Sequence, residues 1–522
     1  MVLFCYNYNE KGLFYTALRK EDFDMRRSGI LMHVSSLPSE YGIGKLGQEA
    51  YAFADFLEKS GVAVWQILPL SPTSYGDSPY QSFSVHAGNP YFIDFETLEQ
   101  QGLLKRDEYA SVDWGSDPKR VDYAKIYENC FPVLKKAYAR FDRTDDAYQE
   151  FFREQADWLP DYGLFMALKA AHGGRPWQEW EKPLAMYEEA AVAAARKEYA
   201  EEAEFYCVLQ YWFYSQWFAL KEYCNGKGIS IVGDIPIYVA YDSVEVWTKP
   251  ELFCLDETHT PTDVAGCPPD FFSPTGQLWG NPLYDWDYHK ETGYAWWIER
   301  LRRATTVYDT VRIDHFRGFE SYYAIPYGNP TAEIGEWREG PNTALFEAAK
   351  EKLGEMSIIA EDLGLITPEV REMLRNCGYP GMKVLQFAFD SGAGCGDLPH
   401  NYTTSSCVVY TGTHDNMTLR GWTESLGAKS VSFAKRYLRV KDRKDLPDAM
   451  VRLAWSSVGE LAVAQMQDFL DAPASARMNT PATPSGNWQY RAQKGDFTAK
   501  TAKKIYQLAE LYNRLPAAEE KV

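Results

Sequence analysis

Short apolar runs recur along the whole chain, and many of them end in glycine or in a polar residue. Eight of these runs are rich in β-branched residues and have the length of strands rather than of helices. They begin at Gly29, Val62, Ile229, Thr310, Ser357, Met382, Cys407 and Leu461. Because helical patterns separate several of the runs, we expect alternating strands and helices, and an α/β fold of the (β/α)8 TIM-barrel type with chemistry at the strand ends.

Two of the separating segments carry clear helix signals. Residues 49–61 have apolar side chains at three- and four-residue spacing and end in a glycine, as an amphipathic helix does. The segment TPEVREMLRNCG begins with Thr367 as a capping residue and has a proline in its first turn. Both segments are predicted to be helices of the barrel.

Two intervals are too long to be simple connections between a strand and a helix. Residues 71–227 contain long helical stretches and predict a mainly helical inserted subdomain, whereas residues 238–309 are rich in proline, glycine and aromatic side chains. Within the second interval, residues 260–286 show few helix signals and are expected to form a long functional loop. We therefore expect an N-terminal extension over 1–25 and one barrel over 26–522 that carries both insertions.

The charge of the chain limits its partners. A net charge of −19 repels nucleic acid and anionic membranes, because both are bound chiefly through lysine and arginine. The chain has no run of about 18 apolar residues and no segment with the pattern of a signal peptide. We expect neither a nucleic acid nor a membrane as partner, and a cytoplasmic location.

The residue composition bears on ligands and on redox state. Aromatic residues make up 15% of the chain, which suits sugar binding because the apolar C–H face of a pyranose packs on a ring, although a large aromatic core explains it equally well. Nine cysteines without a CxxC motif indicate neither a disulfide framework nor a structural zinc site.

Three carboxylates stand at the ends of different predicted strands. They are Asp314 in VRIDHFRG, Glu361 in IIAEDLG and Asp415 in TGTHDN. They are too distant in sequence to share one turn, but a barrel brings its strand ends together at one face. A single acid at such a position is usually a helix cap or part of a salt bridge. Three of them together favour catalysis.

A pair of carboxyl groups in different protonation states can attack a carbon centre and protonate the leaving group, as in glycoside-cleaving enzymes. A separation of about 5.5 Å gives retention of configuration, whereas a wider gap admits water and gives inversion. Arg312 lies two residues before Asp314, on the same face of the strand, where it could orient this carboxylate or form a structural ion pair. His414 is predicted to bind sugar hydroxyls, and the role of His315 stays open.

The motifs VRIDHFRG, IIAEDLG and YTGTHDN, in this order, resemble the catalytic strands of the α-amylase superfamily. Four longer segments, which begin at Gly76, Gly233, Pro268 and Ala476, resemble the amylomaltases, also called 4-α-glucanotransferases or disproportionating enzymes. The resemblance extends over about residues 27–491. The C-terminal segment departs from the family pattern, since Ala482 and Tyr490 stand where a glycine and a tryptophan are expected, and this concerns acceptor preference.

The resemblance implies roles for individual residues. Asp314 falls at the nucleophile of the family, Glu361 at the general acid/base and Asp415 at the stabiliser of the transition state. The resemblance also implies that the following residues bind substrate: Arg312, His414, Ser78, Tyr80, Asp234, Asp270, Asp390 and Asn479, with Gln277 and Trp279 on a loop above them.

The activity implied is that of a retaining 4-α-glucanotransferase that acts on maltooligosaccharides and linear α-1,4-glucans, as a monomer or a homodimer. An α-glucan hydrolase with the same carboxylates is the nearest alternative, because only the occupant of the acceptor site separates the two. A non-catalytic glucan-binding protein is disfavoured, since such a protein needs no acid/base pair.

One further motif points to a nucleotide but has the wrong context. GIGKLG, residues 42–47, fits the dinucleotide pattern GxGxxG, yet a loop that contains Pro38 separates it from the preceding strand. The chain has no HExxH, EF-hand or P-loop motif. No metal and no cofactor is expected.

Overall fold

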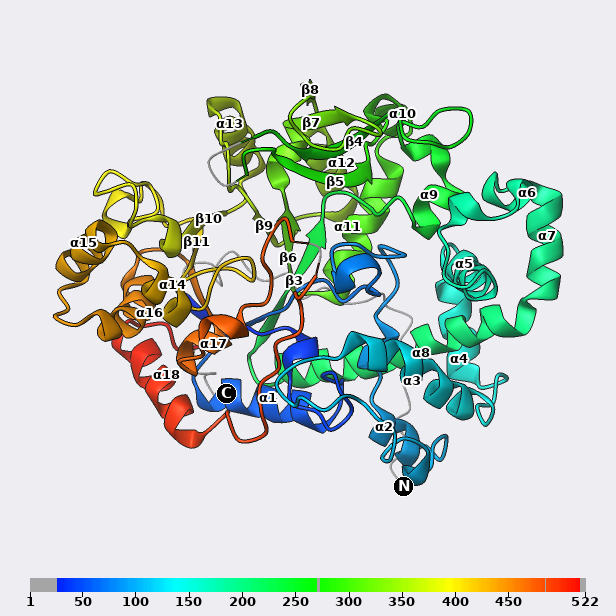
Figure 1. Ribbon diagram of the computed structural model, residues 1–522, viewed down its shortest axis with the longest axis horizontal. Helices are drawn as coiled ribbons and strands as arrows, with labels where there is room; N and C mark the ends of the chain where they lie inside the picture. The colour runs from blue at the N-terminus through cyan, green and yellow to red at the C-terminus, as the bar shows by residue number, and fades with distance from the viewer. Residues whose placement is uncertain (1–25, 270–272, 484, 517–522) are drawn as a thin grey trace.

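The computed structural model describes residues 26–269, 273–483 and 485–516, and the fold is built on eight parallel strands (Figure 1). The strands are β1 (Arg27–Leu31), β2 (Val64–Gln66), β3 (Ser230–Pro236), β6 (Thr310–Asp314), β9 (Ile358–Ala360), β10 (Gly381–Val384), β11 (Cys407–Tyr410) and β12 (Leu461–Gln465). Their order in the sheet is β10-β11-β12-β1-β2-β3-β6-β9, which follows the chain around a circle. The remaining seam is bridged where the Ala360 N–H donates to Pro380 O at 3.0 Å. The barrel prediction is confirmed, and each of the eight runs overlaps one of these strands.

The two segments with helix signals are helices on the outside of the barrel. α1 (Gln48–Lys59) buries Phe53 and Leu57, and the chain leaves it through Gly61 at a φ of 62°. α13 (Pro368–Cys377) begins where Thr367 Oγ1 accepts a hydrogen bond from the Val370 N–H at 3.4 Å, and its C-cap is a left-handed glycine. Both local predictions are confirmed, because capping and amphipathic spacing are strong signals.

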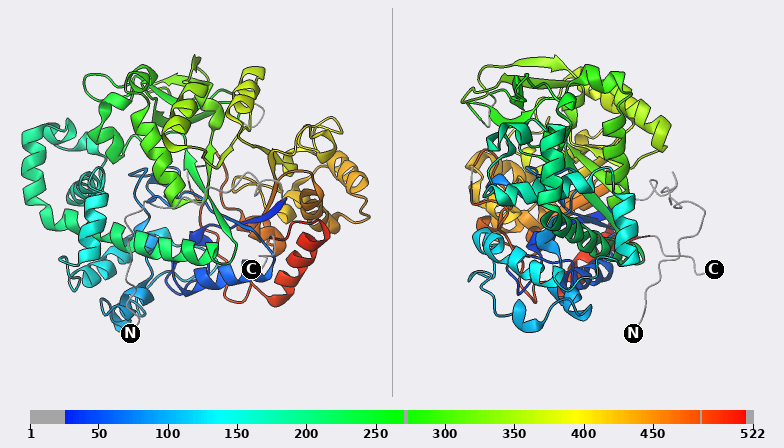
Figure 2. Two further views of the ribbon diagram at one scale, coloured as in Figure 1. Left: turned by 180° about the vertical axis from the view of Figure 1, so that it is seen from behind. Right: turned by 90° about the vertical axis from the view of Figure 1, so that its right-hand side faces the viewer.

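The interval between β2 and β3 is mainly helical. It holds α2 (Phe95–Gln100), α3 (Tyr123–Tyr138), α4 (Asp146–Glu154), α5 (Leu159–Ala171), α6 (Lys182–Ala185), α7 (Glu189–Glu198) and α8 (Ala200–Asn225). Most of these helices gather on one side of the barrel, at the right of Figure 1. The long helix α8 returns from them to pack against α1 and leads directly into β3 (Figure 2).

The interval between β3 and β6 differs from the expected loop. Within residues 260–286, β4 (Asp263–Cys267) and β5 (Gln277–Pro282) pair antiparallel. With β7 (Ser321–Pro326) and β8 (Glu336–Glu339), they form a four-stranded sheet in the order β5-β4-β7-β8, here called the outer sheet. It lies at the top of Figure 1. The expectation of a loop is wrong over these strands, because their pairing depends on segments that come after β6 in the chain.

Further helices complete the chain. They are α9 (Val244–Thr248), α10 (Trp286–Glu291), α11 (Ala295–Val307), α12 (Thr343–Leu353), α14 (Leu419–Ser425), α15 (Ala428–Leu438), α16 (Leu446–Ser456), α17 (Met466–Phe469) and α18 (Ala499–Leu511). None of the helices in the described ranges combines the length and the apolar character needed to cross a membrane.

Side-chain alternation along the strands decides which residues face the interior of the barrel. On β6, Val311 and Ile313 are fully buried among apolar neighbours, while Arg312 and Asp314 point the other way. The register pairs Asp234 of β3 with Arg312 of β6. Two polar side chains from neighbouring strands therefore share the same face at the same height.

A buried arginine that follows α18 lies at the N-terminal ends of two neighbouring barrel strands. The Arg514 guanidinium donates to four backbone carbonyls around the starts of β1 and β12, those of Trp455 at 2.7 Å, Arg27 at 2.8 Å, Ser457 at 3.0 Å and Gly459 at 3.0 Å. Its side chain is fully buried.

We predict that Arg514→Met lowers the free energy of unfolding by about 2–4 kcal/mol, because four buried carbonyls lose a charged donor. Urea unfolding followed by circular dichroism measures the change. Arg420→Met is the matched control, since Arg420 is exposed and its ion pairs with Glu424 and Asp471 lie at the surface. Equal midpoints for the two variants would contradict the prediction.

Candidate active site

Arg312 joins two carboxylates at the C-terminal ends of β3 and β6. Its Nη1 lies 2.6 Å from Asp234 Oδ2, and its Nη2 lies 2.9 Å from Asp314 Oδ1. The Asp234 side chain is fully buried, whereas that of Asp314 is 31% exposed. Burial opposes the charge of Arg312, but the two carboxylates outweigh it and raise its pKa well above the usual value. Asp314 is thus an ion-paired carboxylate that remains accessible.

Glu361 follows β9 and occupies a different environment. Its Oε2 accepts a hydrogen bond from the His315 N–H at 2.7 Å, and its Oε1 accepts one from the Leu363 N–H at 2.9 Å. Burial raises the pKa of Glu361 to about 8 and the charge of Asp314 adds to the rise, while Arg312 and the Leu363 N–H oppose it. Glu361 is therefore protonated at neutral pH.

Asp362 makes only a minor contribution to this shift. Its negative charge is the smallest of the effects on the pKa of Glu361. Its Oδ1 accepts a hydrogen bond from the Met382 N–H at 2.6 Å, so its carboxylate is directed toward β10. The neighbouring acid thus serves mainly to tie β9 to β10.

The turn after Asp314 is strained and fixed to β9. His315 has a left-handed φ of 52°, a conformation that non-glycine residues rarely adopt. Its N–H binds the Glu361 carboxyl, and the Phe316 N–H donates to Glu361 O at 3.0 Å. Burial lowers the pKa of His315 to about 3, with the charge of Arg317 adding to the effect, so the ring is neutral. Its role here is one of backbone geometry, which the residue type does not reveal.

Asp415 lies in the turn after β11 and is held by the C-terminal segment. Asn479 Nδ2 donates to Asp415 Oδ1 at 2.6 Å, and His414 Nε2 lies 3.3 Å from the same oxygen. The Asn479 N–H also donates to His414 O at 3.1 Å, and Arg477 donates to Asp415 O. The carboxylate is 40% exposed. The turn and the C-terminal segment thus form one polar cluster around it.

Tyr80 connects the two groups of acids. Its hydroxyl donates to Asp234 Oδ2 at 2.8 Å, and its ring stacks on the His414 ring with centroids 5.1 Å apart and an interplanar angle of 18°. Trp488 packs against both rings, 5.8 Å from Tyr80 and 5.7 Å from His414. Trp488 is not among the predicted binding residues, although it lies in the segment that begins at Ala476, and its φ of 63° is unusual for its type.

The other predicted binding residues fall into three groups. Ser78 Oγ accepts from the Tyr80 N–H at 3.2 Å and supports that residue. Trp279 packs edge-on against His315 at 4.8 Å and donates to Gln277 Oε1 at 3.2 Å, so β5 brings both residues to the strained turn. Asp390 instead accepts a hydrogen bond from Ser430 of α15 at 2.5 Å, and Asp270 lies outside the described residues.

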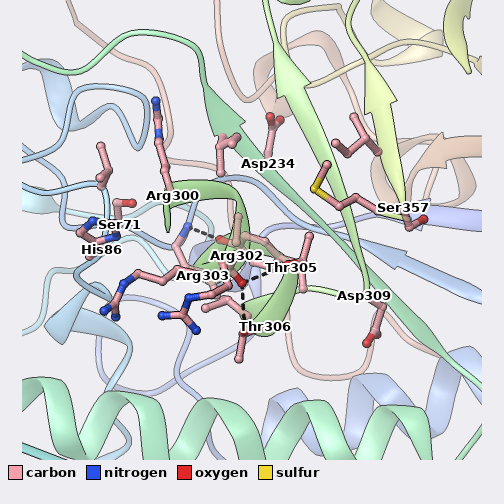
Figure 3. A pocket seen from close by; sticks show the side chains of 18 of the residues that line it. Ser71, His86, Asp234, Arg300, Arg302, Arg303, Thr305, Thr306, Asp309 and Ser357 are labelled. Carbon is pink, nitrogen blue, oxygen red and sulfur yellow. Dashed lines mark hydrogen bonds between the residues drawn. The ribbon is translucent and has the colours of Figure 1, made fainter. Parts of the chain in front are cut away.

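Figure 3 shows a large cavity of about 1640 Å³ that has Asp234 in its wall. Tyr80 and Asp234 line it together with residues of α4, α8, α11, the loop after β2 and the starts of several strands, whereas Asp314, Glu361 and Asp415 are absent from its wall. Of the cations that line it, Lys221 pairs with Asp309 at 3.1 Å and Arg303 with Asp157 at 2.7 Å, whereas Arg300 donates to the backbone carbonyls of Pro236 and Ile237. The three candidate catalytic acids thus lie at the strand ends, outside the wall of this cavity.

The arrangement suits acid–base and nucleophilic chemistry at a carbon centre. An accessible ion-paired carboxylate and a protonated carboxyl group are held by one turn, since the turn after Asp314 also binds Glu361. No group of three or more histidine, cysteine, aspartate or glutamate side chains in the described part of the chain could hold a metal ion.

Comparison with known proteins gives matches over nearly the whole chain. A family model described as 4-alpha-glucanotransferase matches residues 32–498. The chain is 47% identical over 486 residues to the 4-alpha-glucanotransferase of Clostridium butyricum, which covers 92% of this chain and 100% of that protein. It is 48% identical over 494 residues to that of Streptococcus pneumoniae serotype 4, with 94% and 98% covered.

Solved structures agree with these matches. The amylomaltase from Streptococcus agalactiae in complex with acarbose superposes with a TM-score of 0.91 at 46% identity, covering 94% of this chain and 99% of that one. The amylomaltase from Corynebacterium glutamicum has a TM-score of 0.76 at 18% identity, covering 94% and 76%, and supports the fold alone.

The raised pKa of Glu361 predicts a stability effect that depends on pH. Its folded pKa of about 8 lies above the ordinary value of a glutamate in the unfolded chain, so the associated stability is present at low pH and is lost as pH rises to about 8. Glu361→Gln removes this pH dependence of stability. As the pH rises from 6 to 9, the free energy of unfolding of the variant should increase by about 2–3 kcal/mol relative to that of the wild type. Urea unfolding at both pH values measures it, and a constant difference would contradict the prediction.

Proposed function

This chain belongs to the 4-alpha-glucanotransferase family, and we propose that it moves a segment of an α-1,4-glucan to the 4-hydroxyl of an acceptor glucose or maltooligosaccharide. The family places it among the glycosyltransferases that act on α-glucans. The observation that carries the proposed mechanism is the contrast between Asp314 and Glu361. Asp314 is paired with the guanidinium of Arg312, whereas burial favours the protonated form of Glu361.

In the first step, Asp314 attacks C1 of the donor glucan. The bond from C1 to the leaving 4-oxygen breaks, and Glu361 gives its proton to that oxygen, so the shortened glucan leaves as an alcohol. The product is a β-glycosyl ester on Asp314, and Glu361 is left as a carboxylate. The two N–H groups from His315 and Leu363 then stabilise the new negative charge.

In the second step, Glu361 acts as the base. It takes the proton from the 4-hydroxyl of an acceptor sugar while that oxygen attacks C1, and the ester bond to Asp314 breaks. Two inversions at C1 restore the α-linkage, so configuration is retained. Asp415, oriented by Asn479 and His414, is assigned to stabilise positive charge at C1 and to bind ring hydroxyls in both transition states.

The substrate-binding roles proposed here are those that the family resemblance implies. The polar side chains around the acids provide donors and acceptors for sugar hydroxyls, and the aromatic rings provide faces for the apolar side of a pyranose. The residues proposed to bind substrate are Arg312, His414, Ser78, Tyr80, Asp234, Asp270, Gln277, Trp279, Asp390 and Asn479, to which the packing of the Tyr80 and His414 rings adds Trp488. Arg312 and Asp234 are buried, so they act mainly by fixing Asp314 and Tyr80.

The preference for a sugar acceptor over water needs a cover above the reacting centre. Trp279 and Gln277 of β5 stand at the strained turn, and Trp279 contacts the His315 ring directly. A sugar held at this position gains the advantage of proximity over water in solution. The outer sheet is therefore the structural element proposed to favour transfer.

Incubation of the purified protein with maltotriose tests the proposal. We predict a ladder of longer maltooligosaccharides together with glucose, at a nearly constant number of reducing ends, because each bond that breaks is replaced by another. Chromatography of the oligosaccharides and a reducing-end assay follow both quantities. Shorter products with a rising number of reducing ends would instead indicate a hydrolase.

Asp314→Asn and Glu361→Gln are the variants that link this activity to the carboxylates. Each should fold normally and lose at least about 10³-fold of the transfer rate, since removal of one member of a catalytic unit abolishes most of its effect. Asp362→Asn is the matched control, because Asp362 adjoins Glu361 but is directed toward β10. Near-wild-type turnover in either catalytic variant would contradict the assignment.

A further inference from the structure

Arg317 occupies the centre of three segments that meet beside the candidate active site. It lies in the turn that follows Asp314 and His315, and its side chain is almost fully buried. Its Nη1 donates to Leu365 O at 2.6 Å, and its Nη2 donates to Ser321 Oγ at 2.8 Å. Its guanidinium carbon lies 4.0 Å from the centre of the Trp337 ring. One side chain thus joins the turn, the loop after β9 and strand β8.

The outer sheet contacts the same turn through both of its edge strands. On β5, the Trp279 ring meets His315 at 4.8 Å, and on β8 the Trp337 ring covers Arg317. Backbone hydrogen bonds strengthen the second contact, because the Gly340 N–H donates to Glu320 O at 2.8 Å. The turn that follows Asp314 therefore contacts both edges of the outer sheet.

The contact with Leu365 reaches Glu361 through the backbone. Leu365 is two residues after Leu363, whose N–H donates to Glu361 Oε1. A displacement of this short loop would move that donor. Arg317 consequently restrains both the general acid/base candidate and the sheet that stands above it, through its contacts with Leu365 and Trp337.

We propose that Arg317 is a positioning residue that holds the outer sheet on the catalytic turn, and that this attachment sets how a glycosyl-enzyme divides between sugar and water acceptors. The inference rests on the proposed function and adds a specificity determinant to it. When the attachment is intact, β5 keeps Trp279 at the turn and limits access of water to C1. When it is broken, the sheet moves relative to Asp314 and Glu361, and an acceptor sugar loses its proximity advantage.

Lysine is the most informative replacement for Arg317. It keeps the positive charge, but its single ammonium group lacks the planar fork that reaches a carbonyl, a hydroxyl and an aromatic face together. We expect Arg317→Lys to raise the ratio of hydrolysis to transfer on maltotriose by about tenfold or more. The rate of glucose release should fall by a smaller factor than the rate of transfer. Trp337→Leu, which leaves both hydrogen bonds of Arg317, should shift the ratio in the same direction by a smaller factor.

Arg338→Lys is the matched control. Arg338 adjoins Trp337 on β8 but pairs with Asp263 at 3.0 Å and with Glu336 at 2.8 Å, within the outer sheet and at its surface. It should keep the wild-type ratio. Thermal unfolding of each variant verifies that the fold is retained, and Trp337→Leu tests the proposal if Arg317→Lys does not fold.

The outcomes separate this inference from the function on which it rests. If the wild-type protein hydrolyses maltotriose without forming longer products, the proposed function fails. If the wild type transfers, and both Arg317→Lys and Trp337→Leu lose activity with an unchanged ratio, Arg317 has only a structural role and the inference is overturned. A higher ratio in these two variants, with no change in Arg338→Lys, supports it.

Discussion

The buried contact of Arg312 with Asp234 and Asp314 is the constraint on which the rest of the site depends. The β3–β6 register sets Asp234 and Arg312 side by side, and alternation along β6 places Asp314 on the same face. A buried guanidinium is costly unless carboxylates pair with it, and loss of one partner leaves an uncompensated charge. Tyr80 then extends the group from Asp234 to His414. One ion triad thus orders both halves of the site.

Different environments give the two reacting acids different protonation states. Asp314 is partly exposed and touches a cation, whereas Glu361 is buried and has the charge of Asp314 as its neighbour. The strained turn at His315 binds both, because it continues from Asp314 and donates its N–H to Glu361. The strain is maintained by the surrounding hydrogen bonds and by the packing of Trp279. The outer sheet is attached to the same turn. The positions of Asp314 and Glu361 and the position of the sheet above them are therefore coupled.

The sequence was sufficient to predict the barrel and the carboxylates, because both depend on local patterns. Apolar runs, a capping threonine and acids at strand ends need no knowledge of distant partners. The strands β4 and β5 were expected to be loop because residues 260–286 show few helix signals, and because β4 pairs with β7, which lies beyond another barrel strand in the chain. The backbone role of His315 and the packing of Trp488 also depend on contacts across the fold. For Asp390, the family resemblance implied a binding role, and the hydrogen bond from Ser430 of α15 is a further contact across the fold that the sequence did not indicate.

The most direct test of the account is an infrared difference spectrum between the wild-type protein and Glu361→Gln, recorded from pH 5 to pH 9. The account predicts a carboxylic acid band that is present in the wild type at neutral pH, absent from the variant, and lost as the pH passes through about 8, the pKa of Glu361. If no such band distinguishes the two proteins at neutral pH, Glu361 is ionised there. The division of roles between Asp314 and Glu361 would then be contradicted.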